Sequence, residues 1–168
     1  MKEGFDLDVG NEWQTLLDAH NSVKNTESTF KNEANTDLEL AKLQAECKSA
    51  LNKKDDANYK KARKWCVKIE KIKDIPNNGK YDLLDATETN STEDKEWETL
   101  ATSLKENKTD FQSVATNLSD DLATNIKALK AGCRGLQVNT VTTITIGFDE
   151  KFDNAKTWCS VAKTPNKK

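Results

Sequence analysis

The sequence predicts an all-α fold, a disulfide-stapled helical bundle built from two duplicated three-helix units. Three observations support this prediction. One cysteine motif occurs twice, apolar residues recur at helical spacing, and the 168 residues include only two prolines and six glycines, so long stretches lack helix breakers. A chain of this length can bury a core in one domain or in two small ones.

The repeat places all four cysteines and all four tryptophans at equivalent positions in two halves. Each copy has a Glu-Trp-x-Thr-Leu segment, then Leu-x-Ala-x-Cys with a basic residue, and finally Ala-x-x-Trp-Cys. The matched segments are Glu12–Leu16, Leu43–Lys48 and Ala62–Cys66 in the first copy, and Glu96–Leu100, Leu129–Arg134 and Ala155–Cys159 in the second. The chain is therefore expected to use one unit of roughly 80 residues twice.

An N-terminal arm (1–10) precedes the first predicted repeat (11–75), which holds three helices. Apolar residues at i, i+3 and i+4 spacing predict the first helix from about residue 11 and a second around Leu40–Leu51. A polar break at 32–37 separates them, with Asn35 or Thr36 as a candidate N-cap. A turn at 53–58, with Asp55 or Asp56 as N-cap, leads into a third helix extending to Ile72.

Residues 76–91 are predicted to be a linker, residues 92–163 the second repeat, packed with the first as one compact domain, and residues 164–168 a tail. Either one long helix spans 92–131, or it breaks near Ser119–Asp121. The β-branched residues within 136–148 favour a strand by propensity. A helix is expected there instead, because apolar residues continue a helical stripe and no partner strand is predicted. Gly147 is a candidate C-cap and Asp149 the N-cap of the last helix.

The cysteines are predicted to pair as Cys47–Cys66 and Cys133–Cys159. Each pair lies roughly equidistant from a predicted helix–helix turn, and residues placed in this way meet in an antiparallel hairpin. Buried free thiols are the alternative. No metal site is expected, because zinc needs close-set ligand pairs and His20 is the only histidine. Paired cysteines indicate the secretory route.

Composition excludes several classes of function. The net charge of −2 argues against a nucleic-acid-binding protein, and no apolar run approaches the length of a membrane span. The first residues have no apolar segment of a signal peptide, which fits an intracellular chain and a mature secreted chain equally. Phosphate-loop, metalloprotease and serine-nucleophile motifs are absent from the sequence. We therefore expect no catalytic residue, no cofactor and no enzymatic activity, and a structural role for His20.

Two kinds of surface site are predicted. Three sequons, at Asn90, Asn107 and Asn117, are candidate glycosylation sites in a secreted protein. Basic residues gather on the outer face of the predicted third helix as a candidate binding ridge, formed by Lys60, Lys61, Arg63, Lys64, Lys68 and Lys71. The ridge is either the solvated face of an amphipathic helix or a contact for an anionic polysaccharide or protein receptor.

The chain has Lys-, Glu- and Asn-rich predicted helices, three sequons, and cysteines at positions 47, 66, 133 and 159. In these features it resembles small helical salivary proteins of blood-feeding insects, such as those of the mosquito neutrophil-stimulating-factor type. It departs from the odorant-binding pattern, which has more cysteines and a short Cys-x-x-x-Cys spacing. The resemblance implies a secreted, monomeric, non-enzymatic protein that binds a host or partner macromolecule in immune or haemostatic modulation. A helical carrier of a small hydrophobic ligand and an intracellular adaptor with free thiols are the alternatives.

Overall fold

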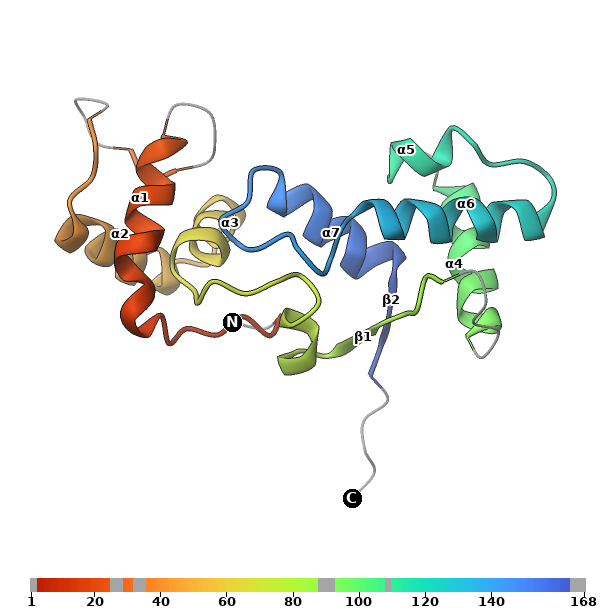
Figure 1. Cartoon of the computed structure of the whole chain (residues 1–168), viewed down its shortest axis with the longest axis horizontal. Coiled ribbons are helices and arrows are strands. Elements are labelled where there is room, and N and C mark those ends of the chain that lie inside the picture. The colour runs from red at the N-terminus through yellow and green to blue at the C-terminus, as the bar shows by residue number, and fades with distance from the viewer. Residues whose placement is uncertain (1–2, 25–28, 32–35, 88–92, 108–109, 164–168) are drawn as a thin grey trace, which may run out of the picture. The chain divides into compact units, whose positions relative to one another are not determined.

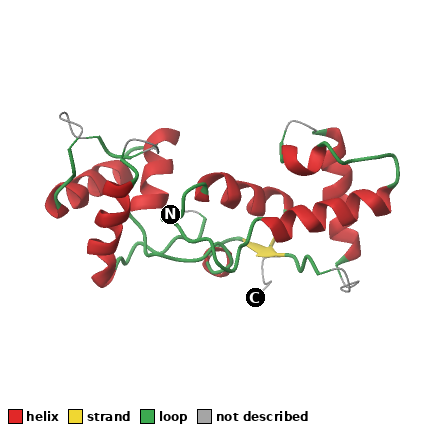
Figure 2. Cartoon of the chain, turned by 45° about the horizontal axis from the view of Figure 1, so that its top comes forward, coloured by secondary structure: helices red, strands yellow, loops and turns green. Residues whose placement is uncertain are grey.

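The structure is a computed structural model that describes residues 3–24, 29–31, 36–87, 93–107 and 110–163. Helices make up most of the described chain, and two short strands form a small sheet (Figures 1 and 2). The α-helices are α1 (Trp13–Ser22), α2 (Leu40–Asn52), α3 (Asp56–Trp65), α4 (Asp94–Glu106), α5 (Gln112–Ala115), α6 (Leu122–Gly135) and α7 (Phe148–Trp158). The shorter elements are the 3₁₀ helices η1 (Gly10–Glu12) and η2 (Ile75–Asn78) and the strands β1 (Tyr81–Leu83) and β2 (Ser160–Ala162). The chain is thus predominantly helical, as predicted.

The chain folds into two compact units. Unit 1 comprises Met1–Gly79 and Val141–Asp149, and unit 2 comprises Lys80–Thr140 and Glu150–Lys168. The division expected from the sequence assigned residues 141–149 to the second repeat, whereas the structure groups them with the first half of the chain. Helix α7 begins in unit 1 and continues in unit 2.

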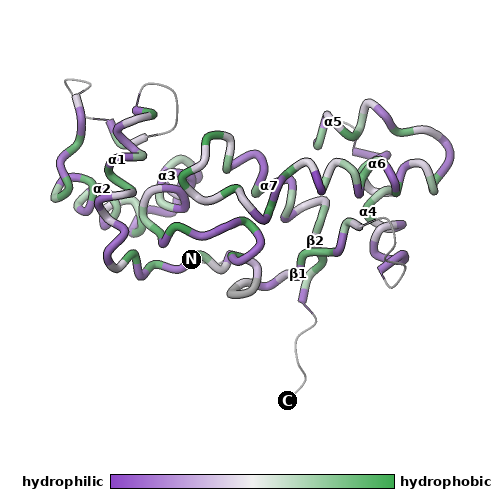
Figure 3. Tube along the Cα trace, in the orientation of Figure 1, coloured by the Kyte–Doolittle hydropathy of each residue, from purple (hydrophilic) through white to green (hydrophobic). Residues whose placement is uncertain are grey.

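In unit 1 the helices α1, α2 and α3 pack against one another around a shared core. Leu16, Leu43 and Trp65 contribute one large side chain from each helix, and each is 0% exposed. The predicted arm also belongs to this unit, since Phe5 is buried and its ring meets that of Phe148 edge to face at 6.3 Å between centroids. Hydrophobic residues alternate with hydrophilic ones along the helices, which is the pattern of a one-sided core contact (Figure 3).

Helix α3 begins as predicted but ends earlier. The side chain of Asp55 accepts a hydrogen bond from the backbone nitrogen of Asn58 at 2.9 Å, which caps the first turn. The predicted continuation to Ile72 is wrong, because the backbone after Trp65 bonds to other segments. The Lys68 amide donates to the Asp6 carbonyl, and the Ile69 amide donates to the Glu12 carboxylate. The Ile72 amide donates to the Val141 carbonyl.

The expected helix over 136–148 is also wrong. Ile72 donates to the Val141 carbonyl at 3.0 Å, and the Thr143 amide donates to Glu70 at 3.1 Å. Lys71 and Thr142 form an isolated antiparallel bridge between these two segments. The segment forms turns with a single bridge residue, Thr142. The side chains of its β-branched residues are restricted in a helix, and residues 70–72 supply the pairing partner that the sequence did not reveal.

Unit 2 contains α4, α5 and α6, with α4 and α5 both packed on α6. The alternative of one long helix over 92–131 is therefore wrong, and the alternative of a break near Ser119–Asp121 is confirmed. An earlier interruption, where α4 ends at Glu106, was not predicted. Asp121 caps α6 by accepting from the Thr124 amide at 3.0 Å. The strands β1 and β2 pair antiparallel, with Tyr81 opposite Ala162.

Both predicted disulfides are present. Cys47, on α2, is bonded to Cys66 with 5.3 Å between the Cα atoms, and Cys133, on α6, is bonded to Cys159 with 5.8 Å between them. All four cysteines are buried. Each bridge joins a helix to the residue that directly follows the next long helix. In unit 1 the bridged helices α2 and α3 pack against each other, as the hairpin argument from spacing requires, whereas α6 and α7 are not a packed pair, so there the pairing was right without the expected hairpin.

Candidate functional site

The candidate binding ridge is not a single exposed helical face. Lys60 is exposed and pairs with Asp56 at 3.1 Å, and the half-buried Lys61 lies 5.8 Å from the centre of the Phe30 ring. Arg63 is buried, and its Nε donates to Asp149 Oδ1 at 2.6 Å. The ridge prediction treated Arg63 as a surface cation, and the structure uses it inside unit 1.

The other ridge residues divide in the same way. Lys64 is 1% exposed and its Nζ lies 5.1 Å from the centre of the Trp65 ring. Lys68 and Lys71 are exposed but lie beyond the end of α3, so helical spacing does not place them. The prediction of one helical ridge is therefore wrong, because the helix ends early and two of its cations are buried.

Two of the three sequon asparagines lie on the described surface. Asn107 and Asn117 are exposed, and their side-chain nitrogens donate to backbone oxygens one helical turn earlier, to Ser103 at 2.9 Å and to Ser113 at 3.0 Å. Asn90 lies outside the described residues.

His20 is a buried structural histidine. Its Nε2 accepts a hydrogen bond from the Phe30 amide at 3.1 Å, and its Nδ1 lies 3.3 Å from the Asn21 side-chain oxygen. The ring packs edge to face against Trp65. Burial lowers the pKa of His20 below its usual value, because charging the ring would cost desolvation, although the contact with the Asn21 side-chain oxygen opposes this shift.

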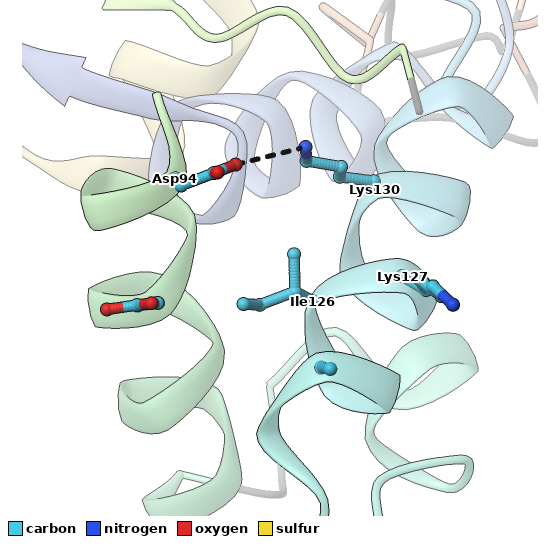
Figure 4. A pocket seen from close by; sticks show the side chains of 6 residues that line it. Asp94, Ile126, Lys127 and Lys130 are labelled. Atoms are coloured by element: carbon cyan, nitrogen blue, oxygen red, sulfur yellow. Dashed lines mark ion pairs between the residues drawn. The ribbon is translucent and has the colours of Figure 1, made fainter. Parts of the chain in front are cut away.

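A surface feature that the sequence did not predict lies between α4 and α6 in unit 2. It is a hollow of about 340 Å³ lined by Asp94 and Glu98 from α4 and by Ala123, Ile126, Lys127 and Lys130 from α6. Figure 4 shows Ile126 pointing into the space between the two helices, while Lys127 points away from α4. Lys130 Nζ lies 3.9 Å from Asp94 Oδ1 and 5.6 Å from the centre of the Trp97 ring.

A second hollow of about 480 Å³ continues along the same helices. Its lining includes Glu98, Thr102 and Glu106 from α4 and Leu122 from α6. Because Glu98 borders both hollows, we treat them together and call them the α4–α6 groove. The sequence showed that residues 82–106 are acidic, with eight acidic and two basic side chains, but only the fold brings this segment beside the apolar residues of α6.

Within the described part of the chain, no three or more His, Cys, Asp or Glu side chains are grouped so that they could hold a metal ion. Nor is any described helix long and apolar enough to cross a membrane. Comparison of the chain with protein-family models, with curated proteins and with solved structures gives no match.

Proposed function

We propose that this chain is a secreted, non-enzymatic protein that acts by binding a partner macromolecule. The observation that carries the proposal is that all four cysteines form two buried disulfides, one in each unit. Disulfides of this kind persist in oxidising compartments, where small proteins use them to stabilise limited cores. The exposed sequons Asn107 and Asn117 are compatible with the same compartment.

The surface supports a macromolecular partner better than a small apolar ligand. Both hollows of the α4–α6 groove are open to solvent and bordered by carboxylates, whereas a carrier for a hydrophobic ligand needs an enclosed, mostly apolar cavity. The exposed cations Lys60, Lys68 and Lys71 offer a separate contact for an anionic polysaccharide or an acidic protein surface.

We also propose that the two units arose by duplication of a three-helix ancestor. The support is the repeated Leu-x-Ala-x-Cys and Ala-x-x-Trp-Cys segments, together with the equivalent bridge that each copy forms. In both copies the Leu-x-Ala-x-Cys cysteine lies on a helix, and its partner directly follows the end of another, α3 or α7. On this proposal, the segment 141–147 is an addition to the second copy, whose two cysteines are 26 positions apart where those of the first copy are 19 apart.

The compartment is tested by thiol titration of the native chain exported from insect cells. We expect no reactive thiol, and we expect the double variant C47S/C66S to lose about 3 kcal/mol of unfolding free energy, because the bridge closes a short loop in the unfolded chain. Four reactive thiols in the exported native protein would contradict the proposal.

Binding is tested by presenting the immobilised chain to plasma proteins, leukocytes and heparin. We expect saturable binding to at least one of them. Loss of heparin binding in the triple variant K60E/K68E/K71E, with the helical circular dichroism unchanged, would assign that contact to the exposed lysines. The absence of saturable binding across the whole panel would count against a role in binding host macromolecules.

A further inference from the structure

We propose that the α4–α6 groove is a docking site for a basic amphipathic helix of a partner protein. The inference rests on the proposed binding function and names the class of partner for one surface. Three observations support the inference: the length of the groove, the carboxylates along the α4 wall and the apolar residues along the α6 wall.

The groove is long enough for a peptide segment. Asp94 borders one end and Glu106 the other, and both lie on α4. Twelve helical steps separate them, which corresponds to about 18 Å, or a little over three turns of helix. A small ligand would fill only one of the two hollows, whereas an elongated segment lying along α4 would contact both.

The charge along the groove is negative. Glu98 and Glu106 are exposed, and neither forms an ion pair with another described residue. The cations of α6 do not neutralise them. Lys127 points away from α4 (Figure 4), and the side chain of Lys130 is only 7% exposed beside Asp94. The two unpaired carboxylates attract lysine and arginine side chains and speed their association.

The other wall of the groove supplies the apolar contact. Leu122 is 39% exposed, which is unusual among the large apolar side chains here, and Ile126 follows one helical turn later. Residues four apart lie on the same helical face, so the two side chains form a short apolar strip beside the carboxylates. An amphipathic helix binds such a surface by placing its apolar stripe on the strip and its cations beside it.

The carboxylates belong to the second copy alone. When the Glu-Trp-x-Thr-Leu segments of the two copies are aligned, Asp94, Glu98 and Glu106 correspond to Gly10, Gln14 and Ser22. The helix shared by both copies therefore does not require acidic residues at these positions. This favours a role in recognition over a role in the stability of the scaffold.

The test uses the full disulfide-bonded chain and a fluorescein-labelled peptide of leucine and lysine, about four helical turns long, with its leucines on one face. Fluorescence anisotropy measures the affinity. The variants are E98Q/E106Q, which removes charge with little change in shape, and L122Q, which removes the exposed apolar residue. The matched control is E96Q/E150Q, which removes two carboxylates from helices of the same unit outside the groove.

We expect E98Q/E106Q to weaken binding by about tenfold and L122Q by about fivefold, because charge and apolar contact both contribute. The control should change the affinity by less than about twofold, and a scrambled peptide of the same composition, without the apolar face, should bind more weakly than the amphipathic one. The inference is overturned if the peptide does not bind, or if the control weakens binding as much as E98Q/E106Q. If a partner from the panel above binds equally well to E98Q/E106Q and L122Q, the groove inference fails and the binding function stands.

Discussion

Gly132 marks the closest approach between α5 and α6. A Cβ atom built at Gly132 would lie 2.1 Å from Val114 Cγ2 and 3.1 Å from Phe111 Cζ. Carbon atoms in contact normally lie about 3.5–4.0 Å apart, so the valine methyl group overlaps the added carbon by more than 1 Å on that scale. Val114 is 2% exposed and Phe111 is 7% exposed, so neither side chain can move freely into solvent.

The substitution Gly132→Ala should therefore destabilise unit 2 despite the better helix propensity of alanine. Overpacking of a buried contact lowers the free energy of unfolding by about 1–3 kcal/mol. Replacing glycine by alanine inside a helix raises it by about 1 kcal/mol. We expect a net loss of up to about 2 kcal/mol in urea unfolding followed by circular dichroism. The matched control is Gly135→Ala on the same helix, where no atom lies within 4 Å of the added carbon; it should be neutral or slightly stabilising.

A double-mutant cycle identifies the contact responsible. Val114→Ala removes the atom nearest to the new Cβ, so in that background Gly132→Ala should cost nothing and should gain up to about 1 kcal/mol from helix propensity. The reasoning is refuted if Gly132→Ala is as well tolerated as Gly135→Ala, or if its cost is the same with and without Val114.

Two further perturbations probe unit 1. Asp149→Asn should lower the free energy of unfolding in urea by about 3 kcal/mol or more, because it removes the carboxylate that faces the buried Arg63 guanidinium. The control Asp56→Asn, in an exposed ion pair, should lower it by less than about 1 kcal/mol. Equal losses in the two variants would contradict the role of burial. The lowered pKa of His20 means that the unfolded chain binds more protons than the native one, so stability should be highest above the unfolded pKa of about 6.5 and should fall as the pH drops through and below it. His20→Gln should flatten the dependence measured between pH 7.5 and 5, and an unchanged slope would assign it to other groups.

Short sequence patterns correctly predicted those features of the fold that depend on residues close together in the chain. Asp55 caps α3 because a helix start needs a short acceptor, and Cys47 meets Cys66 because the two flank the turn between the packed helices α2 and α3. The errors involve partners far away in the chain. Arg63 was assigned to the surface by its charge, but its carboxylate partner is Asp149, separated from it by 86 positions. The α4–α6 groove was missed for the same reason, since neither helix alone shows that its neighbour supplies the opposite wall.

The differences between the two copies of the cysteine motif coincide with two features of unit 2, the contact of α6 with α5 and the α4–α6 groove. The leucine and the cysteine of Leu-x-Ala-x-Cys are buried in both copies. Glu46 of the first copy is replaced by Gly132, which lies against α5, and the exposed Gln44 is replaced by the buried Lys130 beside the groove. The shared positions thus maintain the core and the bridge, whereas the substituted positions allow α5 to approach α6 closely at Gly132 and bring a cation next to Asp94. If the groove is a recognition surface, returning Lys130 to the glutamine of the first copy should alter binding through α6, because it removes the cation beside Asp94, while leaving the disulfide of unit 2 intact.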